Sequence, residues 1–329
     1  MLVLVAGACL GAAGFAAEQH YRHWLPKPVR ENGGWRVVDQ HGRRFSGLSL
    51  SGGHLTWQDG PLILLMDLAS GRVRVLGPGA ENRSTWRPVV SDRYVVWFEG
   101  RATGAERGEA YSYDLDSRRR RPVAAVVRPA SYAAVSGGRA VWTELTEGGA
   151  ARLRALDLSS GASMSVATRG GEPLVDGDLV VLKRSGPGGD ALAALDLTTR
   201  REWRLVAANG RAMTGLAVSG GRVTWGWTDA TGGAGRVLIR DVATGATELV
   251  AEAPGLAGPA MDGDLVVWAE AGSGGGSVIR GRRLGGGPAF EIAATGARVE
   301  TVQVSDGTVA WLAQEGGSRS VIGTVSVPE

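Results

Sequence analysis

Cysteine and histidine are scarce in this 329-residue chain. The single cysteine, Cys9, excludes an internal disulfide framework and any cysteine-based zinc site in the folded body. All four histidines lie within the first 54 residues, at His20, His23, His41 and His54. Most histidine-dependent catalysis is therefore excluded for the rest of the chain.

Signatures of the common catalytic and cofactor sites are also missing. The sequence contains no G-x-S-x-G nucleophile elbow, no H-E-x-x-H zinc motif, no phosphate-binding G-x-x-x-x-G-K-[ST] loop and no calcium-binding loop. Two Asp-Gly-Asp segments, 176–178 and 262–264, occupy the place of Ser-Gly-Gly turns elsewhere, so we interpret them as hairpin turns. We expect neither a metal site nor a cofactor, and an enzyme is the less favoured interpretation.

Lysine is almost absent, with only Lys27 and Lys183, so arginine supplies nearly all of the 36 basic residues. They exceed the 33 acidic residues by only three, and the pI of 9.3 reflects this small excess. The balance does not indicate a polybasic nucleic-acid surface, and we expect no nucleic-acid partner.

What is abundant is internal repetition. An apolar residue, a short polar turn and an alternating strand recur seven times, and the strand ends on tryptophan in six copies. The final residues of the copies are Trp57, Trp97, Trp142, Leu182, Trp225, Trp268 and Trp311. Their intervals of 40, 45, 40, 43, 43 and 43 residues match the length of a four-stranded propeller blade. We expect these tryptophans to fill the space between neighbouring sheets.

Each tryptophan strand is followed by a strand that closes on a turn such as Asp-Leu-Ser-Ser-Gly (157–161), and then by another β-type run. Every repeat therefore predicts four antiparallel strands, and the chain predicts an all-β, seven-bladed β-propeller over residues 34–329. The last copy lacks its outer strand, which residues 34–40 can supply by pairing with residues 320–327. This pairing would close the ring and remove two exposed sheet edges.

Residues 1–17 include an apolar run from Leu2 to Ala17, which we interpret as a signal peptide or a membrane anchor. As a helix, sixteen residues would rise about 24 Å, less than the roughly 30 Å hydrocarbon thickness. We expect export to the periplasm, cell surface or extracellular space, with N-terminal membrane association as an open alternative. Residues 18–33, with Pro26 and Pro28, would be a linker. We expect a monomer.

The repeats resemble those of the bacterial translocation protein TolB and related secreted propellers, the PD40 type. Pro88, Pro173 and Pro259 match the proline that opens the family's repeat, and Asp114-Leu115, Asp157-Leu158, Asp196-Leu197 and Asp241-Val242 match its Tyr-Asp-Leu strand. The chain lacks the family's turn proline and has no room for an N-terminal α/β domain, so the resemblance implies the fold and not the TolB role. Quinoprotein-type repeats are similar to a lesser degree, with only Trp203 near their later tryptophan.

Arginine recurs 13 or 14 residues before the tryptophan position in six of the seven copies. The residues are Arg43, Arg44, Arg83, Arg128, Arg169, Arg211 and Arg298. A ring of guanidinium groups at one mouth of the channel would suit carboxylates or phosphates. The alternative interpretation is scattered, solvated arginine in an arginine-rich protein.

These features favour a non-enzymatic binding or scaffold module of the cell envelope, which binds an anionic ligand or partner segment on the face with variable loops. The partner would be a protein, an acidic peptide or an acidic glycan. One alternative is a propeller hydrolase or lyase that uses channel carboxylates such as Glu172 and Glu300. Another is a purely structural domain held at the membrane by the apolar terminus.

Overall fold

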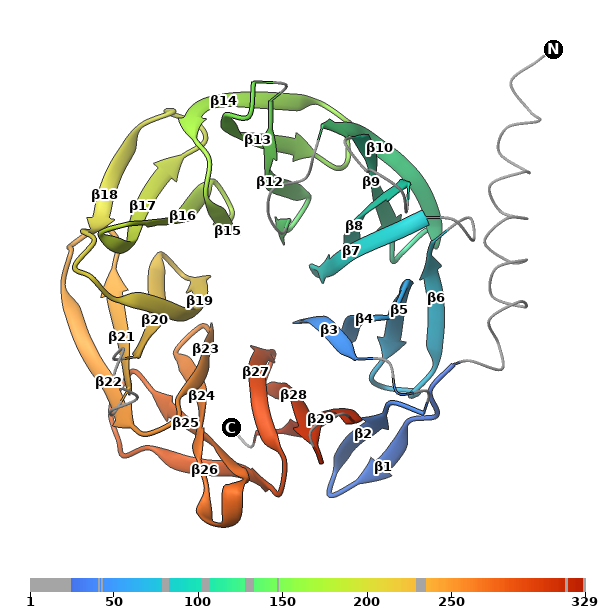
Figure 1. Ribbon diagram of the computed structural model, residues 1–329, viewed down its shortest axis with the longest axis vertical. Coiled ribbons are helices and arrows are strands. Elements are labelled where there is room, and N and C mark those ends of the chain that lie inside the picture. Colours follow the sequence, from blue (N-terminus) through green and yellow to red (C-terminus); the bar gives the residue numbers. More distant parts are fainter. Residues whose placement is uncertain are drawn as a thin grey trace. The chain divides into compact units, whose positions relative to one another are not determined.

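The structure is a computed structural model that describes residues 25–40, 42, 44–78, 83–101, 107–127, 133–146, 148–228, 235–316 and 319–327. Within these ranges nearly all regular structure is β-strand, with a short 3₁₀ helix at Ser273–Gly275. None of the helices in these residues has the length and apolar character needed to cross a membrane. The strands form seven antiparallel sheets, so the predicted all-β seven-bladed propeller is confirmed (Figure 1).

The chain divides into two compact units, and the first unit holds three blades. Each blade is a four-stranded antiparallel meander. The first blade has β3 (Phe45–Ser51), β4 (His54–Asp59), β5 (Leu62–Asp67) and β6 (Val73–Gly77). The second has β7 (Arg83–Val90), β8 (Tyr94–Arg101), β9 (Arg107–Asp114) and β10 (Arg119–Val127). The third has β11 (Ala134–Ser136), β12 (Arg139–Leu145), β13 (Ala151–Asp157) and β14 (Ser163–Arg169).

The second unit holds the other four blades. The fourth blade has β15 (Glu172–Asp176), β16 (Leu179–Gly186), β17 (Gly189–Asp196) and β18 (Glu202–Val206). The fifth has β19 (Ala212–Ser219), β20 (Arg222–Thr228), β21 (Gly235–Asp241) and β22 (Thr247–Ala253). The sixth has β23 (Ala257–Asp262), β24 (Leu265–Ala271), β25 (Ser277–Arg283) and β26 (Phe290–Thr295). The seventh has β27 (Arg298–Ser305), β28 (Thr308–Glu315) and β29 (Arg319–Ser326).

The seventh blade is completed from the other end of the sequence, as the repeats predict. Strand β2 (Gly34–Val38) pairs with β29, with Arg36 opposite Gly323. The Arg36 guanidinium also donates to both carboxylate oxygens of Glu315, at 2.9 and 3.1 Å. A further strand, β1 (Val29–Glu31), pairs with β2 and gives this blade five strands. Strand β1 lies inside the segment expected to be a linker.

The repeated tryptophans belong to the core. Those of β4, β8, β12, β20 and β24 are at most 2% exposed, whereas Trp311 is partly buried. Trp86 and Trp227, which fall outside the repeated position, also lie in strands: Trp86 packs against the core in β7, and Trp227 is 5% exposed in β20.

In each of the first five blades, the hairpin between the third and fourth strands contains an aspartate that accepts hydrogen bonds from backbone amides of the turn. Asp157 Oδ1 accepts hydrogen bonds from the Ser159 hydroxyl and from the backbone amides of Ser159 and Ser160, and these bonds hold its pKa well below the usual range. Hydrogen bonds from Thr244 lower the pKa of Asp241 in the same way. A carboxylate accepts these hydrogen bonds better than a carboxylic acid does. The hydrogen bonds of the turns are therefore strongest when the aspartates are ionised.

These aspartates predict a loss of stability in acid. A folded-state pKa below the unfolded value of about 3.9 stabilises the protein above that pH, and the contribution is lost as the pH falls through the folded-state pKa. We expect Asp157→Asn to unfold at a lower denaturant concentration than the parent at pH 7, with a difference that narrows between about pH 4 and pH 2. Denaturant unfolding at several pH values measures this difference in midpoint between the variant and the parent. Asp116→Asn, in an exposed turn position, is the control. A difference that stays constant with pH would contradict the role of the ionised turn.

The closing pair of strands depends on the absence of a side chain at Gly34. A Cβ atom there would stand 1.6 Å from the Thr324 carbonyl oxygen, so β2 would have to move away from β29. We expect Gly34→Ala to lower the free energy of unfolding by about 1–3 kcal/mol, the usual cost of overpacking. Gly53→Ala is the control, because a Cβ atom at that hairpin meets nothing within 4 Å. Equal stabilities of the two variants would show that the β2–β29 contact is not tight.

Candidate functional site

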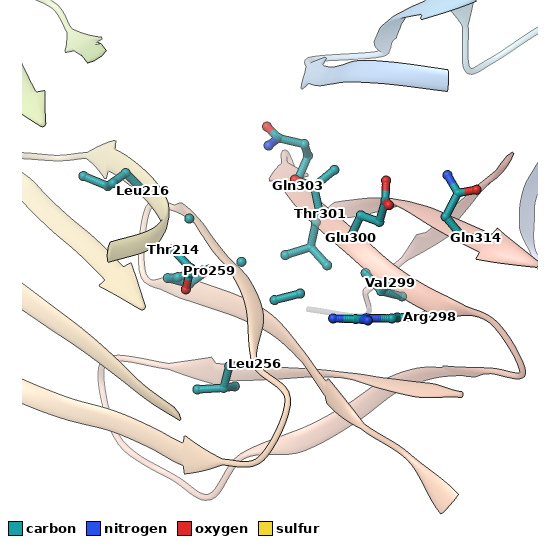
Figure 2. A pocket seen from close by; sticks show the side chains of 14 residues that line it. Thr214, Leu216, Leu256, Pro259, Arg298, Val299, Glu300, Thr301, Gln303 and Gln314 are labelled. Carbon is teal, nitrogen blue, oxygen red and sulfur yellow. The ribbon is translucent and has the colours of Figure 1, made fainter. Parts of the chain in front are cut away.

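A cavity of about 750 Å³ lies within the second unit, along the first strands of three consecutive blades. Strands β19, β23 and β27 supply most of its wall, and Gln314 comes from β28. In Figure 2 the polar side chains of Arg298, Glu300, Gln303 and Gln314 come from the seventh blade, and Thr214, Leu216 and Pro259 lie across from them. The volume is within the range of small-molecule sites.

A β-bulge shapes the wall in each of the three strands. The extra residue is Gly215 in β19 and Glu300 in β27, and the register shift in β23 falls between Ala257 and Ala260. Gly215 has a φ of +55°, and a Cβ atom there would stand 2.1 Å from the Gly258 carbonyl carbon. Glycine therefore lets β19 and β23 approach each other closely, while the bulge in β27 presents a carboxylate.

Arg298 and Glu300 are the charged residues of the lining, and both side chains are exposed. The Arg298 side chain makes no hydrogen bond or ion pair with any residue that the structure describes. Thr214 adds a hydroxyl oxygen that is buried and has no hydrogen-bond partner among those residues. The pocket thus combines an available guanidinium with a carboxylate, amides and hydroxyls above an apolar floor that includes Leu256.

Arginines elsewhere are commonly paired with carboxylates. Arg184 contacts Glu202 at 2.7 Å, and Arg236 contacts Glu252 at 2.9 Å. Further pairs join Arg36 to Glu315, Arg93 to Asp114, Arg282 to Glu248 and Arg283 to Asp264. Arg298 has no such carboxylate partner among the described residues, and it lines the cavity.

Three glutamates with largely buried side chains form ion pairs with arginines of the same protein. Glu99 is fully buried and accepts hydrogen bonds from the Trp97 indole at 2.8 Å and from Arg120 at 2.9 Å. Arg152 and Arg154 bind Glu144, while Trp268 and Arg280 bind Glu270. Each glutamate stands two residues after a repeated tryptophan, a regular spacing in the sequence that is not among the predicted site signals. These carboxylates hold strands together and are not available to a ligand.

The arginines of the predicted series lie in different parts of the structure. Arg298 lines the cavity, whereas Arg211 precedes β19 and rests over the Trp227 ring at 5.9 Å. Arg44 is exposed ahead of β3 in the first unit. Arg83 begins β7 and Arg169 ends β14, both also in the first unit. Arg43 and Arg128 lie outside the described residues.

The two carboxylates considered for catalysis lie on different blades. Glu172 begins β15 and forms an ion pair with Lys183 at 2.6 Å, whereas Glu300 is on β27 in the cavity. Glu172 is not part of the cavity lining, so the pocket does not hold the two together. The described residues hold no group of three or more histidine, cysteine, aspartate or glutamate side chains positioned to bind a metal ion.

No protein-family model matches the sequence, and a search of curated proteins found no relative. Among solved structures, an oligogalacturonate lyase in complex with manganese matches with a TM-score of 0.65 and 15% identity, over 93% of this chain and 96% of the lyase. The β-propeller domain of the trilobed protease from Pyrococcus furiosus matches with a TM-score of 0.63 and 11% identity, over 87% and 98%. TolB from Acinetobacter baumannii is more distant, at 0.49 and 11%, over 92% and 80%. The likeness is one of fold, which binding proteins and enzymes share.

The Glu99 cluster predicts which arginines matter for stability. Removing Arg120 leaves the fully buried Glu99 carboxylate without its guanidinium partner, so we expect Arg120→Ala to cost about 3–5 kcal/mol. Arg93, whose side chain is 53% exposed, pairs with Asp114 at the surface, so Arg93→Ala should lower the free energy of unfolding far less than Arg120→Ala does. Denaturant unfolding measures both. Adding Glu99→Gln to Arg120→Ala should recover part of the loss, and no recovery would mean that lost packing, not the buried charge, is responsible.

Proposed function

We propose that this protein is a non-catalytic binding module whose pocket on β19, β23 and β27 takes the anionic group of a ligand or partner segment. The observation that carries the proposal is Arg298. It lies exposed in a cavity without a partner among the described residues, in a protein whose arginines are commonly paired.

The chemistry of the pocket suits this role. A guanidinium binds a carboxylate or phosphate through two parallel hydrogen bonds, which fixes orientation as well as adding affinity. Gln303, Gln314 and Thr301 supply further donors and acceptors from the same blade, and the apolar floor can exclude water around the bound group. Arg211, which precedes β19 in the same unit, would extend the contact to a longer partner.

The second candidate function is a hydrolase or lyase, because Glu300 offers a carboxylate in the same cavity. The fold likeness to an oligogalacturonate lyase is compatible with it but is equally compatible with binding. A carboxylate needs a second acid or base to divide proton transfer between two groups, and Glu172 is engaged by Lys183. Binding is therefore the better supported function.

We further propose that the protein works in the cell envelope as a monomer, since the apolar segment 2–17 has the composition of an export signal or anchor. Sequencing the N-terminus of the protein recovered from cell fractions tests this proposal. An intact N-terminus on protein recovered from the cytosol would contradict it.

Loss of the Arg298 charge should weaken anion binding. Thermal unfolding is followed with galacturonate, succinate, inorganic phosphate and the dipeptide Ala-Ala, at about 150 mM salt, where the Debye length is roughly 8 Å and loose attraction is screened. A probe at 100 times its Kd stabilises the protein by about 2.7 kcal/mol. We expect Arg298→Gln to weaken binding by about 10- to 100-fold, because a hydrogen-bonded charge contributes about 1.5–3 kcal/mol.

Arg204→Gln is the matched control, because Arg204 is exposed on the outer strand β18 and lies outside the cavity. Binding that survives in Arg298→Gln, or that falls equally in Arg204→Gln, would locate the anion site elsewhere. Stabilisation by none of the probes would contradict a small-anion site in this pocket.

A further inference from the structure

We propose that the pocket binds the C-terminal segment of a partner peptide as an added β-strand, antiparallel to β27, with the terminal carboxylate of the peptide on Arg298. The inference rests on the proposed function and names the class of ligand. Its basis is the backbone of β27, which anion binding alone does not require. The Glu300 carboxylate takes no part in it, because Glu300 has an interaction of its own within the chain.

The cavity meets β27 along one edge of the strand. Six consecutive residues, from Arg298 to Gln303, line the cavity. Successive side chains of a strand point to opposite faces of the sheet, so a cavity against one face would meet mainly alternate residues. Figure 2 shows Arg298, Val299 and Thr301 following one another along the strand beside the cavity. The unbroken run therefore makes the backbone itself part of the wall.

The edge that meets the cavity is where the sheet ends. Strand β27 is the last in the order β1-β2-β29-β28-β27, so β28 covers one of its two edges. The two-residue turn 306–307 joins β27 to β28, and both of its φ angles are positive, at 47° and 67°. Such a turn makes the residues that flank it a hydrogen-bonded pair, and alternation along the ladder then makes Val302 and Trp311 a non-hydrogen-bonded pair. The amide and carbonyl of Val302 therefore point away from β28, towards the open edge.

An edge of this kind can accept a further strand. The N–H and C=O groups along it are a template for another chain, and strand addition is a recurring mode of peptide recognition. The Val299 amide is already used, because it donates to the Ser277 hydroxyl at 3.0 Å. We therefore expect the added strand to exchange its main pair of hydrogen bonds with Val302.

Arg298 determines the direction of the added strand. It stands at the start of β27, and its exposed side chain lines the cavity. An antiparallel strand ends beside that start and brings a C-terminal carboxylate to the guanidinium, whereas a parallel strand would bring an N-terminus there. Val302 lies four residues further along, and the bulge uses one of them, so the two positions are about 10 Å apart at roughly 3.3 Å per residue. Four extended residues span this distance.

The opposite wall suits the side chains of such a peptide. Leu216, Leu256 and Pro259 lie across the cavity from β27 (Figure 2). A peptide can pack apolar side chains against this wall while its backbone pairs with β27. Inorganic phosphate or a small sugar acid has neither the backbone nor the side chains to use both walls.

Titration calorimetry of the full chain tests the proposal with N-acetyl-Thr-Val-Thr-Val, whose β-branched residues favour extended backbone. Its C-terminal amide lacks the negative charge, and N-acetyl-valine keeps the charge without the strand. We expect the tetrapeptide to bind at least about tenfold more tightly than either. In Arg298→Gln the tetrapeptide and its amide should bind equally. Arg204→Gln, exposed on β18, should keep the preference of the parent.

Methylation of single backbone amides of the peptide tests the strand pairing itself. Alternate residues of an antiparallel strand direct their amides towards its neighbour, so one N-methyl group would meet the edge of β27 and the next would point away. We expect N-methylation of either the second or the third residue, but not of both, to weaken binding at least about tenfold. Equal effects at the two positions would overturn the pairing.

The outcomes separate this proposal from the one on which it rests. If N-acetyl-valine binds as tightly as the tetrapeptide and its binding needs Arg298, the anion site stands and the added strand is wrong. If the amide binds the parent as tightly as the free acid, the terminal carboxylate is not what Arg298 recognises. If no probe shows binding that depends on Arg298, both proposals are wrong. Arg298 is exposed, so we expect its variant to fold, which thermal unfolding checks.

Discussion

A four-stranded sheet with apolar side chains on both faces cannot be stable alone, and this constraint governs the whole chain. Each blade must be covered by its neighbours, so the core is a series of apolar layers between consecutive sheets. In the first unit, Phe98 of the second blade packs edge-on against Trp142 of the third, with ring centroids 5.9 Å apart. In the second unit, residues of the fifth and sixth blades share one buried cluster around Trp268. The repeated tryptophan fills these layers.

A sheet must also limit its unpaired edges, which explains why the last blade takes its outer strand from the N-terminal part of the chain. Without β2, the edge of β29 would expose unpaired backbone donors and acceptors. Strand β2 satisfies them, and its side chains add the Arg36–Glu315 ion pair and a hydrogen bond from the Trp35 amide to Thr324. Segments almost 290 residues apart in sequence are thereby joined in one sheet.

Most of the fold could be predicted from the sequence because the spacing of the repeated tryptophan position shows where the second strand of each blade lies. The exception, β1, is a three-residue strand with no repeat to mark it. Its signal was the Asn32-Gly33 pair, which adopts positive φ angles of 49° and 80° in the turn between β1 and β2. The glutamates two residues after Trp97, Trp142 and Trp268 have the same regular spacing. Their role could not be predicted from it, because an arginine pairs with each carboxylate and the Trp97 and Trp268 indoles, but not that of Trp142, also donate to it.

The site was less predictable, for a reason that lies in sheet geometry. Counting back from the tryptophan placed Arg298 near the start of a first strand, but the same count also selected Arg211, whose side chain lies over Trp227. Whether a side chain enters the cavity depends on where the strand gains an extra residue. A shift of one residue reverses the face to which each side chain points, and spacing alone does not show it.

Bulges recur in first strands opposite the tryptophan-bearing strand, and they divide structural from functional positions. Glycine stands at the irregularities of β3, β19 and β23, as Gly47, Gly215 and Gly258, each with positive φ. The corresponding residue is Arg87 in β7 and Glu300 in β27. The tryptophan opposite fills the core, and the glycines at the bulges of β19 and β23 are also constrained, because a Cβ atom at Gly215 would stand 2.1 Å from the Gly258 carbonyl carbon. The bulge of β27 accommodates a longer side chain at the corresponding position, so the backbone irregularity is shared while the space beside it differs from blade to blade.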